Sequence, residues 1–200
     1  MMSSNFFEAV KTRRSVYSIS KSSPVSDDKI REIVEEAVLH SPTAFNSQTS
    51  RAIVLLGEEH DKLWDITTET LRKIVPADQF ESTGEKMKSF KSGYGTVLFF
   101  EDQAIVKQLQ ENYAAYADNF PIWSNQSSGM LQFVVWTAFA EVGLGASLQH
   151  YNPLIDEEVK QTWGLPSEWK LIAELPFGSI AAAPGSKEFQ PVEERVKVHK

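Results

Sequence analysis

Two groups of cationic residues near the ends of the chain have the chemistry of a phosphate site. Arg13 and Arg14 are followed directly by Ser15, which places two guanidinium groups beside a hydroxyl. Guanidinium groups bind phosphate oxygens in a bidentate manner, so this segment suits a phosphorylated ligand. Lys187 and Arg195 lie in a tail where two cations have no evident packing role. Alternatively, the arginine pair is a basic helix C-cap and the tail cations are simply solvated.

A loop rich in small and amide side chains has the chemistry to recognise a heterocycle. The segment Ser41–Gln48 reads SPTAFNSQ and contains Pro42, Thr43, Ala44, Asn46 and Gln48. Amide groups can bind the carbonyl and ring-nitrogen edge of a planar ring. The same composition is also typical of an ordinary turn after a helix. Together with the cations, the loop favours a phosphorylated, planar cofactor.

Other common catalytic chemistries lack the residues that they need. The four histidines are scattered and form no ligand pair, which favours a structural role for each and predicts no metal site. The absence of cysteine excludes disulfides, thiolate metal sites and cysteine nucleophiles. The sequence contains no Gly-x-Ser-x-Gly motif, so nothing in it indicates a serine hydrolase. Gly143-Leu144-Gly145 lacks a third glycine and follows a helix, so a nicotinamide would not be held on a Rossmann loop.

The composition indicates one globular domain over residues 1–200. The chain is 42% hydrophobic and 24% charged, which is normal for a folded domain. A net charge of −7 disfavours nucleic acid and anionic membranes as partners. The N-terminal segment lacks the pattern of a secretory signal, and the longest apolar run, over 130–140, is too short to span a bilayer. We therefore expect a cytoplasmic protein.

The candidate segments are separated by helices and strands with recognisable patterns. Helices are predicted from Asn5 to about Arg13 and over 27–40, 58–75, 79–90 and 156–163, and strands over 51–56, 96–100, 146–150, 169–175 and 195–198. The helix over 27–40 is the clearest, because Ser26 is a good N-cap and apolar residues recur at helical spacing. The alternation of helices and strands by itself favours a parallel α/β sheet.

One further helix is apolar on nearly all sides. Ser124 is its predicted N-cap, and it continues to Val142. Its apolar stripe includes Met130 and Val134, while Phe133 and Trp136 lie off that stripe. A helix that is apolar all round is buried on several sides. In a chain of this length a second subunit is expected to cover part of it, so we predict an obligate homodimer.

Taken in order, these segments resemble the FMN-dependent nitroreductase family. The resemblance rests on Arg13-Arg14-Ser15, the Ser41–Gln48 loop, the stretch from Gly143 to Pro153, and Lys187 with Pro191 to Arg195. It covers nearly the whole chain. The segments over 93–102 and 148–151 resemble those of the compact branch related to the fatty-acid-repression-mutant nitroreductases.

The resemblance implies an α+β fold with three layers (α/β/α), a central sheet rich in antiparallel pairs and an intertwined homodimer. This expectation replaces the parallel sheet that the pattern alone favours. FMN is expected in the dimer interface. The implied FMN-binding residues are Arg13, Arg14, Ser15, Tyr17, Pro42, Thr43, Ala44, Asn46, Gln48, Leu148, Gln149, His150, Lys187 and Arg195.

Each of these segments has an implied role. The arginine-serine segment and the tail cations would hold phosphate and ribityl oxygens. The Ser41–Gln48 loop would come from the partner subunit, and Leu148–His150 would run along the flavin edge and offer a backbone N–H to N5. Tyr17 departs from the pattern, because many family members carry a second basic residue there.

The implied activity is electron transfer from NAD(P)H to small oxidised acceptors, such as nitroaromatics and quinones, by a ping-pong mechanism. Flavin N5 would carry the chemistry, so no catalytic side chain is predicted. Candidates to line an aromatic substrate pocket, or simply to pack, are Tyr113, Tyr116, Phe120 and Trp123. Two alternatives are an FMN-binding redox sensor or flavin store with little turnover, and a dehydrogenase or flavin-destroying oxygenase on the same fold.

Overall fold

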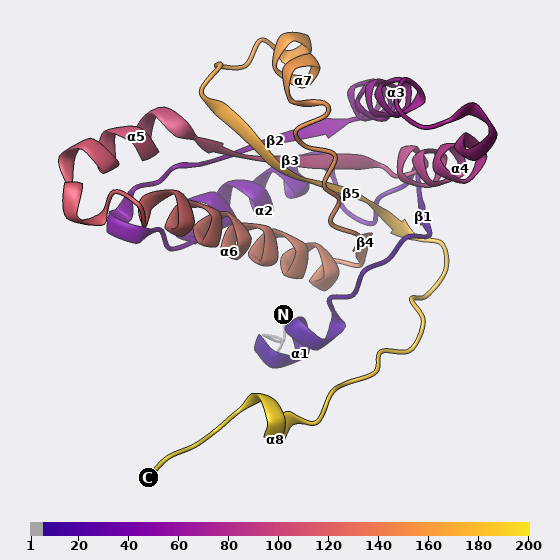
Figure 1. The fold of residues 1–200 in the computed structure, drawn as a ribbon. Helices are drawn as coiled ribbons and strands as arrows, with labels where there is room; N and C mark the ends of the chain where they lie inside the picture. Colours follow the sequence, from indigo (N-terminus) through magenta and orange to yellow (C-terminus); the bar gives the residue numbers. More distant parts are fainter. Residues whose placement is uncertain (1–5) are drawn as a thin grey trace.

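The computed structural model describes residues 6–200, and the C-terminal tail extends away from a layered body (Figure 1). The helices are α1 (Phe6–Thr12), α2 (Asp27–His40), α3 (Glu58–Arg72), α4 (Phe80–Lys91), α5 (Gln103–Asn112), α6 (Phe120–Glu141), α7 (Asp156–Trp163) and α8 (Val192–Arg195). The strands are β1 (Ile19–Ser20), β2 (Ser50–Leu56), β3 (Gly95–Asp102), β4 (Leu144–Ala146) and β5 (Trp169–Ile180). Short 3₁₀ turns cover Ala44–Asn46, Ala77–Gln79 and Ala114–Tyr116.

These strands form one sheet in the order β1-β5-β3-β2, with β4 also paired to β5. Each of these strand pairs is antiparallel. For β2 and β3 the reason lies in their connection: α3 and α4 follow β2 as a pair, so the chain returns to the end of the sheet that it left. The next strand then runs in the opposite direction. The antiparallel sheet implied by the resemblance is confirmed, and the parallel sheet favoured by the pattern alone is wrong.

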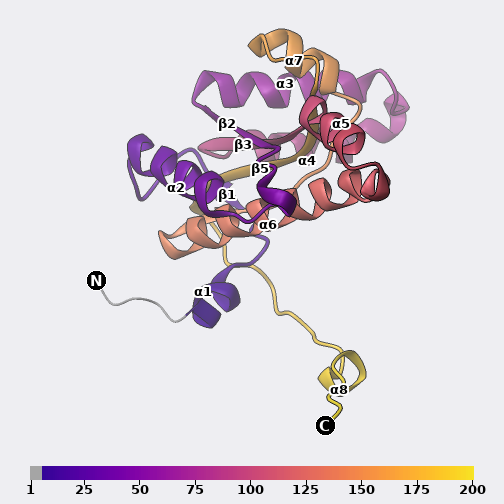
Figure 2. The same ribbon diagram turned by 90° about the vertical axis from the view of Figure 1, so that its left-hand side faces the viewer.

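Helices cover both faces of the sheet and make three layers (Figures 1 and 2). On one face, α2 and α6 pack in a core that contains Phe139 and Phe177, whose ring centroids lie 4.7 Å apart. On the other face, α3, α4 and α7 pack in a core that contains Trp64 and Phe90. Alternate residues of β3 enter the two cores, since side chains of a strand point to opposite faces. The predicted α+β fold with three layers is confirmed.

Most of the predicted helices lie where the sequence places them. The bounds predicted over 27–40 and 156–163 agree with α2 and α7, and the helices predicted over 58–75 and 79–90 agree closely with α3 and α4. The predicted start of the first helix, Asn5, lies outside the described residues. The pattern does not predict α5, which begins at a good N-cap, because the Asp102 side chain accepts the Ala104 N–H at 3.1 Å.

Three other expectations are wrong. Ser124 is not an N-cap: α6 begins at Phe120, and the buried Ser124 hydroxyl donates to Oε2 of Glu101 at 2.6 Å. A strand over 146–150 does not form, because β4 ends at Ala146 and beyond it Gln149 makes an isolated bridge to β5. The tail over 195–198 is not a strand, since it leaves the sheet and therefore has no strand to pair with.

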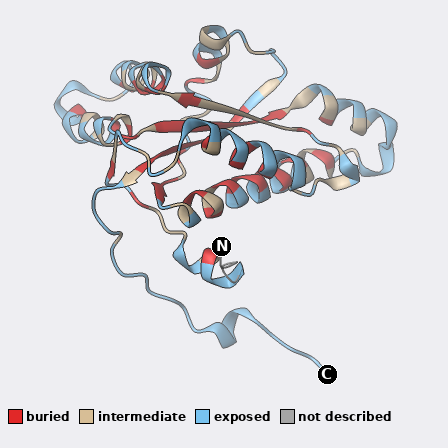
Figure 3. Cartoon of the chain, turned by 180° about the vertical axis from the view of Figure 1, so that it is seen from behind, coloured by how far each residue is buried: buried red, intermediate tan, exposed pale blue. Residues whose placement is uncertain are grey.

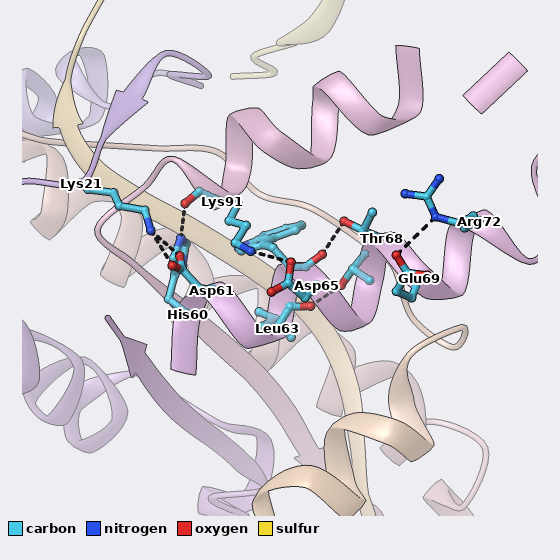
Figure 4. A network of polar contacts seen from close by, with 11 residues as sticks. Lys21, His60, Asp61, Leu63, Asp65, Thr68, Glu69, Arg72 and Lys91 are labelled. Carbon is cyan, nitrogen blue, oxygen red and sulfur yellow. Dashed lines mark hydrogen bonds and ion pairs between the residues drawn. The ribbon is translucent and has the colours of Figure 1, made fainter. Parts of the chain in front are cut away.

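A buried histidine joins α3 to the end of α4 and to β3. His60 Nδ1 lies 2.8 Å from the Thr96 hydroxyl. On the other side of the ring, His60 Nε2 lies 3.3 Å from the Lys91 carbonyl oxygen (Figure 4). Trp64 Nε1–H donates to Thr96 Oγ1 at 3.0 Å, which leaves the Thr96 proton to be donated to His60 Nδ1. The network therefore assigns the imidazole proton to Nε2. Burial lowers the pKa of His60 from 6.5 to about 4, so the ring is neutral.

We expect acid to destabilise the fold through His60. Between pH 6.5 and 4 the folded state binds fewer protons than the unfolded state, so the free energy of unfolding falls as the pH falls. The difference between the two pKa values corresponds to about 3 kcal/mol. Urea denaturation of the parent and of His60→Asn at both pH values measures this contribution. The parent should lose about 3 kcal/mol more than the variant, whereas equal losses would show that His60 does not titrate as expected.

Candidate active site

Three of the predicted phosphate ligands line one pocket. Arg13 and Arg14, just after α1, and Lys187 from the tail enclose a pocket of about 320 Å³, together with Val10, Lys11 and Phe189. Arg14 Nη2 donates to the Gly185 carbonyl oxygen at 2.8 Å, which fixes the tail beside the arginine pair. The structure thus brings together segments that are 171 positions apart. We call this pocket the cation pocket.

The charges of the cation pocket are not neutralised by carboxylates. Lys11 pairs with Glu8 at 2.6 Å, but Arg13, Arg14 and Lys187 form no ion pair within residues 6–200. The Arg13 guanidinium lies 4.3 Å above the ring centroid of Trp136 on α6, and its Nε is buried with no hydrogen-bond acceptor among the described residues. Burial, and then the charge of Arg14, lower the pKa of Arg13. Because such cations are stabilised by an anion, the pocket has the donor set of an anion site.

The segment Leu148–His150 is joined to the arginine segment through β4. Ser15 forms a parallel bridge with Ala146, and Val16 N donates to the Ala146 carbonyl oxygen at 2.9 Å. Tyr17, two residues beyond Ser15, is exposed. Ser15 and Tyr17 therefore lie beside the strand that leads to Leu148.

A backbone donor is available in this segment. The N–H and C=O of Gln149 both bond to Glu174 on β5, at 2.7 and 3.0 Å. Consecutive N–H groups of an extended segment point to opposite sides, so the His150 N–H points away from β5. It makes no hydrogen bond within the described part of the chain.

The Ser41–Gln48 loop has a strained backbone. Phe45, Asn46 and Gln48 have φ values of 59°, 48° and 49°, a region that a bulky non-glycine residue rarely adopts. The loop is nevertheless held in place, because Thr43 Oγ1 accepts the Gln48 N–H at 3.1 Å and Arg51 Nη1 donates to the Gln48 carbonyl oxygen at 2.7 Å. Strain of this kind is concentrated at functional sites, where surrounding contacts maintain it.

An aromatic cluster lies around Phe45 of the loop, and its other four members are the residues that the sequence suggested would line a substrate pocket or simply pack. The half-exposed Phe45 ring contacts the four predicted aromatic residues, with centroid distances of 5.1 to 6.1 Å, and these are Tyr113, Tyr116, Phe120 and Trp123. A second pocket, of about 290 Å³, is lined by Ala44, Phe45, Trp123, Gln126, Ser127 and Met130. The sequence analysis did not single out Phe45, although a bulky aromatic residue in a loop of small and polar residues could have indicated a functional position.

Within one chain, the loop and the cation pocket lie at different ends of α6. Phe45 contacts Trp123 near the start of the helix, whereas Arg13 stacks on Trp136. These two tryptophans are about 20 Å apart along a helix axis. Arg195 is also separate, because exposed α8 lies on the tail that extends beyond α1 (Figures 1 and 2). The chain therefore brings Arg13, Arg14 and Lys187 together in the cation pocket. The Ser41–Gln48 loop and Arg195 of the same chain lie away from that pocket.

Helix α6 exposes an apolar face on the side away from the sheet. In Figure 3 its buried positions face the sheet, and exposed positions follow its other side. The exposed apolar side chains of α6 are Ile122, Met130, Phe133 and Val134. A groove of about 330 Å³ between α1 and α6 adds Phe6 and Ala9 to this surface. An extended apolar surface of this kind is typical of a protein interface.

The comparisons with known proteins agree on one family. The model of the nitroreductase family matches residues 10–179. Nitroreductase FRM2 of Saccharomyces cerevisiae is 32% identical over 187 residues, which cover 92% of this chain and 93% of FRM2. This relative agrees with the resemblance to the fatty-acid-repression-mutant branch. The matched range ends before Lys187 and Arg195.

Solved structures of nitroreductase CinD from Lactococcus lactis, in complex with nicotinic acid and with 4-nitrophenol, superpose on this fold. They are 48% and 49% identical, with TM-scores of 0.89, and the match covers 98% of this chain and 100% of CinD. Within residues 6–200, no helix combines the length and apolarity needed to cross a membrane. The matched family model and these relatives lead to one conclusion: the chain belongs to the nitroreductase family of oxidoreductases.

Proposed function

We propose that the chain is a single-domain FMN enzyme that works as a homodimer and transfers electrons from NAD(P)H to small nitroaromatic or quinone acceptors. When bound, FMN supplies the hydride and electron transfer chemistry at its ring. The protein contributes binding, orientation and electrostatics. The observation that carries the proposal is the cation pocket, where Arg13, Arg14 and Lys187 carry charges that no carboxylate of the described chain neutralises.

The residues around the cation pocket fit FMN. A phosphate with about two negative charges matches three cations, and the orphaned Nε of Arg13 gives one donor in a fixed, buried position. Ser15 and Tyr17 extend the polar surface toward β4. Beyond β4, the His150 N–H is a donor of the kind that can hydrogen-bond a ring nitrogen of the cofactor.

We further propose that the Ser41–Gln48 loop completes the site in the partner subunit. The loop and the cation pocket are separated along α6, and the exposed apolar face of the same helix lies between them. A twofold axis across that face would place the loop of one subunit near the cation pocket of the other. Asn46 and Gln48, which are exposed, would then present their amides to the cofactor ring.

The acceptor and the nicotinamide are proposed to use the same face of the site in turn. CinD binds nicotinic acid and 4-nitrophenol, and both ligands are planar rings. The aromatic cluster around Phe45 offers a surface on which such rings can stack. One shared binding face predicts ping-pong kinetics, because the first product must leave before the acceptor binds.

A visible spectrum of the purified protein, followed by steady-state kinetics, tests the proposal. We expect the spectrum to show a flavin band, and the cofactor released on denaturation to be FMN. We also expect parallel double-reciprocal lines when NAD(P)H is varied at several concentrations of 4-nitrophenol or a quinone. Intersecting lines would contradict a shared face. FMN binding without turnover would instead indicate the flavin store or redox sensor, and loss of the flavin itself under air would indicate an oxygenase.

A further inference from the structure

A fully buried glutamate lies directly behind Leu148–His150. Glu174 is on β5, opposite Leu98 of β3, and its side chain enters the apolar layer between the sheet and α3, α4 and α7. Its exposed fraction is 0%, and its Oε1 has no hydrogen-bond partner in residues 6–200. Burying a carboxyl group in an apolar layer is unfavourable, and the fold itself would be served by an apolar residue at this position.

Glu174 is bonded to the chain on both sides of His150. Its backbone exchanges two hydrogen bonds with Gln149, at 2.7 and 3.0 Å. Its Oε2 accepts the Tyr151 N–H at 3.0 Å. The Tyr151 ring is in turn packed against Trp64, with 5.9 Å between centroids. The residue before His150 and the residue after it are therefore both fixed by Glu174, and the unbonded His150 N–H lies between them.

We propose that Glu174 is a positioning residue for the cofactor: it holds the backbone on both sides of His150, so that the His150 N–H is fixed toward N5 of FMN. The inference rests on the proposed function and deepens it. Glu174 acts through this segment and is not itself placed in contact with the cofactor. Its carboxyl group also gives the site a charge that depends on pH.

The groups that face Glu174 decide when that charge forms. Burial raises the pKa of Glu174 to about 8, the Tyr151 N–H acts in the opposite direction, and Asp156 of α7 raises the pKa further. Burial raises the pKa of Asp156 itself, and the nearby Lys160 and Lys170 act in the opposite direction. The Tyr151 phenol, whose pKa is raised to about 12, stays neutral. Glu174 is therefore protonated at neutral pH and becomes an anion above pH 8.

The midpoint potential of the FMN-loaded full chain, measured from pH 6 to pH 10, tests the inference. An anion behind the N5 edge disfavours the reduced, more negative form of the cofactor, so the potential should fall by an extra step around pH 8. We expect about a tenfold change in relative affinity for the two forms, or about 30 mV. Glu174→Gln keeps an acceptor for Tyr151 but has no charge, so it should lack the step.

Two further variants complete the design. Glu101→Gln is the matched control, because Glu101 is also buried but binds Ser50 and Ser124 instead, and it should keep the step. Glu174→Leu removes the acceptor for the Tyr151 N–H and should lower kcat at pH 7, where Glu174 carries no charge in the parent, with little change in KM for NAD(P)H. The infrared band of a protonated carboxyl should disappear around pH 8 in the parent and be missing in Glu174→Gln.

The outcomes separate this inference from the proposed function. If the protein binds FMN and the potential of Glu174→Gln follows that of the parent at every pH, Glu174 is only structural and the inference is wrong. The inference is equally wrong if Glu101→Gln removes the step as well. A parent protein that does not bind FMN at all would overturn the proposed function, and this inference with it.

Discussion

Replacing Arg13 by methionine is expected to weaken FMN binding by roughly tenfold to a hundredfold and to leave riboflavin binding nearly unchanged. Methionine keeps an apolar stem against Trp136 but removes the guanidinium, whose Nε has no acceptor within the described chain. Hydrogen bonds to charged groups contribute about 1.5–3 kcal/mol, and about 1.4 kcal/mol is tenfold in affinity. Riboflavin lacks the phosphate, so it does not report on this contact. Fluorescence titration of both ligands measures the difference.

Lys11→Met is the matched control for Arg13→Met. Lys11 lines the same pocket but already forms an ion pair with Glu8, so its removal should change FMN affinity little. Arg195→Ala is also expected to weaken FMN binding. Because α8 lies apart from the cation pocket of its own chain, we propose that this contact comes from Arg195 of the partner subunit. If Arg13→Met weakens riboflavin and FMN binding equally, Arg13 has a structural role and the phosphate assignment fails.

A single charge on the exposed face of α6 should convert the proposed dimer into monomers. Met130 is exposed in the isolated chain, so Met130→Asp should hardly change the stability of one subunit. In a twofold interface the substitution buries two carboxylates without partners, which costs several kcal/mol. We therefore expect the dissociation constant of the dimer to rise on the order of a thousandfold or more. Sedimentation velocity, with FMN absorbance recorded together with protein, should show monomers that have lost the cofactor.

Ile74→Asp is the matched control for Met130→Asp, because it also introduces a carboxylate at an exposed apolar position. Ile74 is exposed just after α3, in the layer on the opposite face of the sheet, and this variant should remain a dimer with bound FMN. A folded Met130→Asp monomer that keeps parental FMN affinity would show that the site is complete within one chain. A Met130→Asp variant that remains dimeric would show that this face of α6 is not the interface.

The local patterns of the sequence predict the elements whose signals are local. Helix α2 has a Ser26 cap that accepts the Lys29 N–H and an apolar stripe that packs in the core, so propensity and packing agree. Ser124 carries the same capping chemistry, but it is used to bond Glu101, which is far away in sequence. No short window contains that partner. For the same reason strand direction could not be read from alternation, because α3 and α4 together determine it.

For the candidate site too, the sequence could predict some parts and not others. Residue types and order predict the segments that contribute, and the structure brings Arg13, Arg14 and Lys187 together as a family resemblance implies. Glu174 was missed, because a single acid within an apolar strand looks like a surface position, and its partners Gln149 and Tyr151 are more than twenty residues away. Trp136 was recognised only as a position off the apolar stripe. Its contact with Arg13 depends on how α1 packs on α6.

A mixed dimer gives the most direct test of a site shared between subunits. One subunit carries Arg13→Met and the other carries Asn46→Gly, which removes the loop amide but suits the φ of 48° at that position. Each variant homodimer should bind FMN weakly at both sites. In the purified mixed dimer, a shared site combines the intact cation pocket of one chain with the intact loop of the other. We therefore predict one site of parental FMN affinity per mixed dimer, measured by fluorescence titration. If each site were built from a single chain, both sites would carry one defect, and a mixed dimer without any tight site would contradict the account.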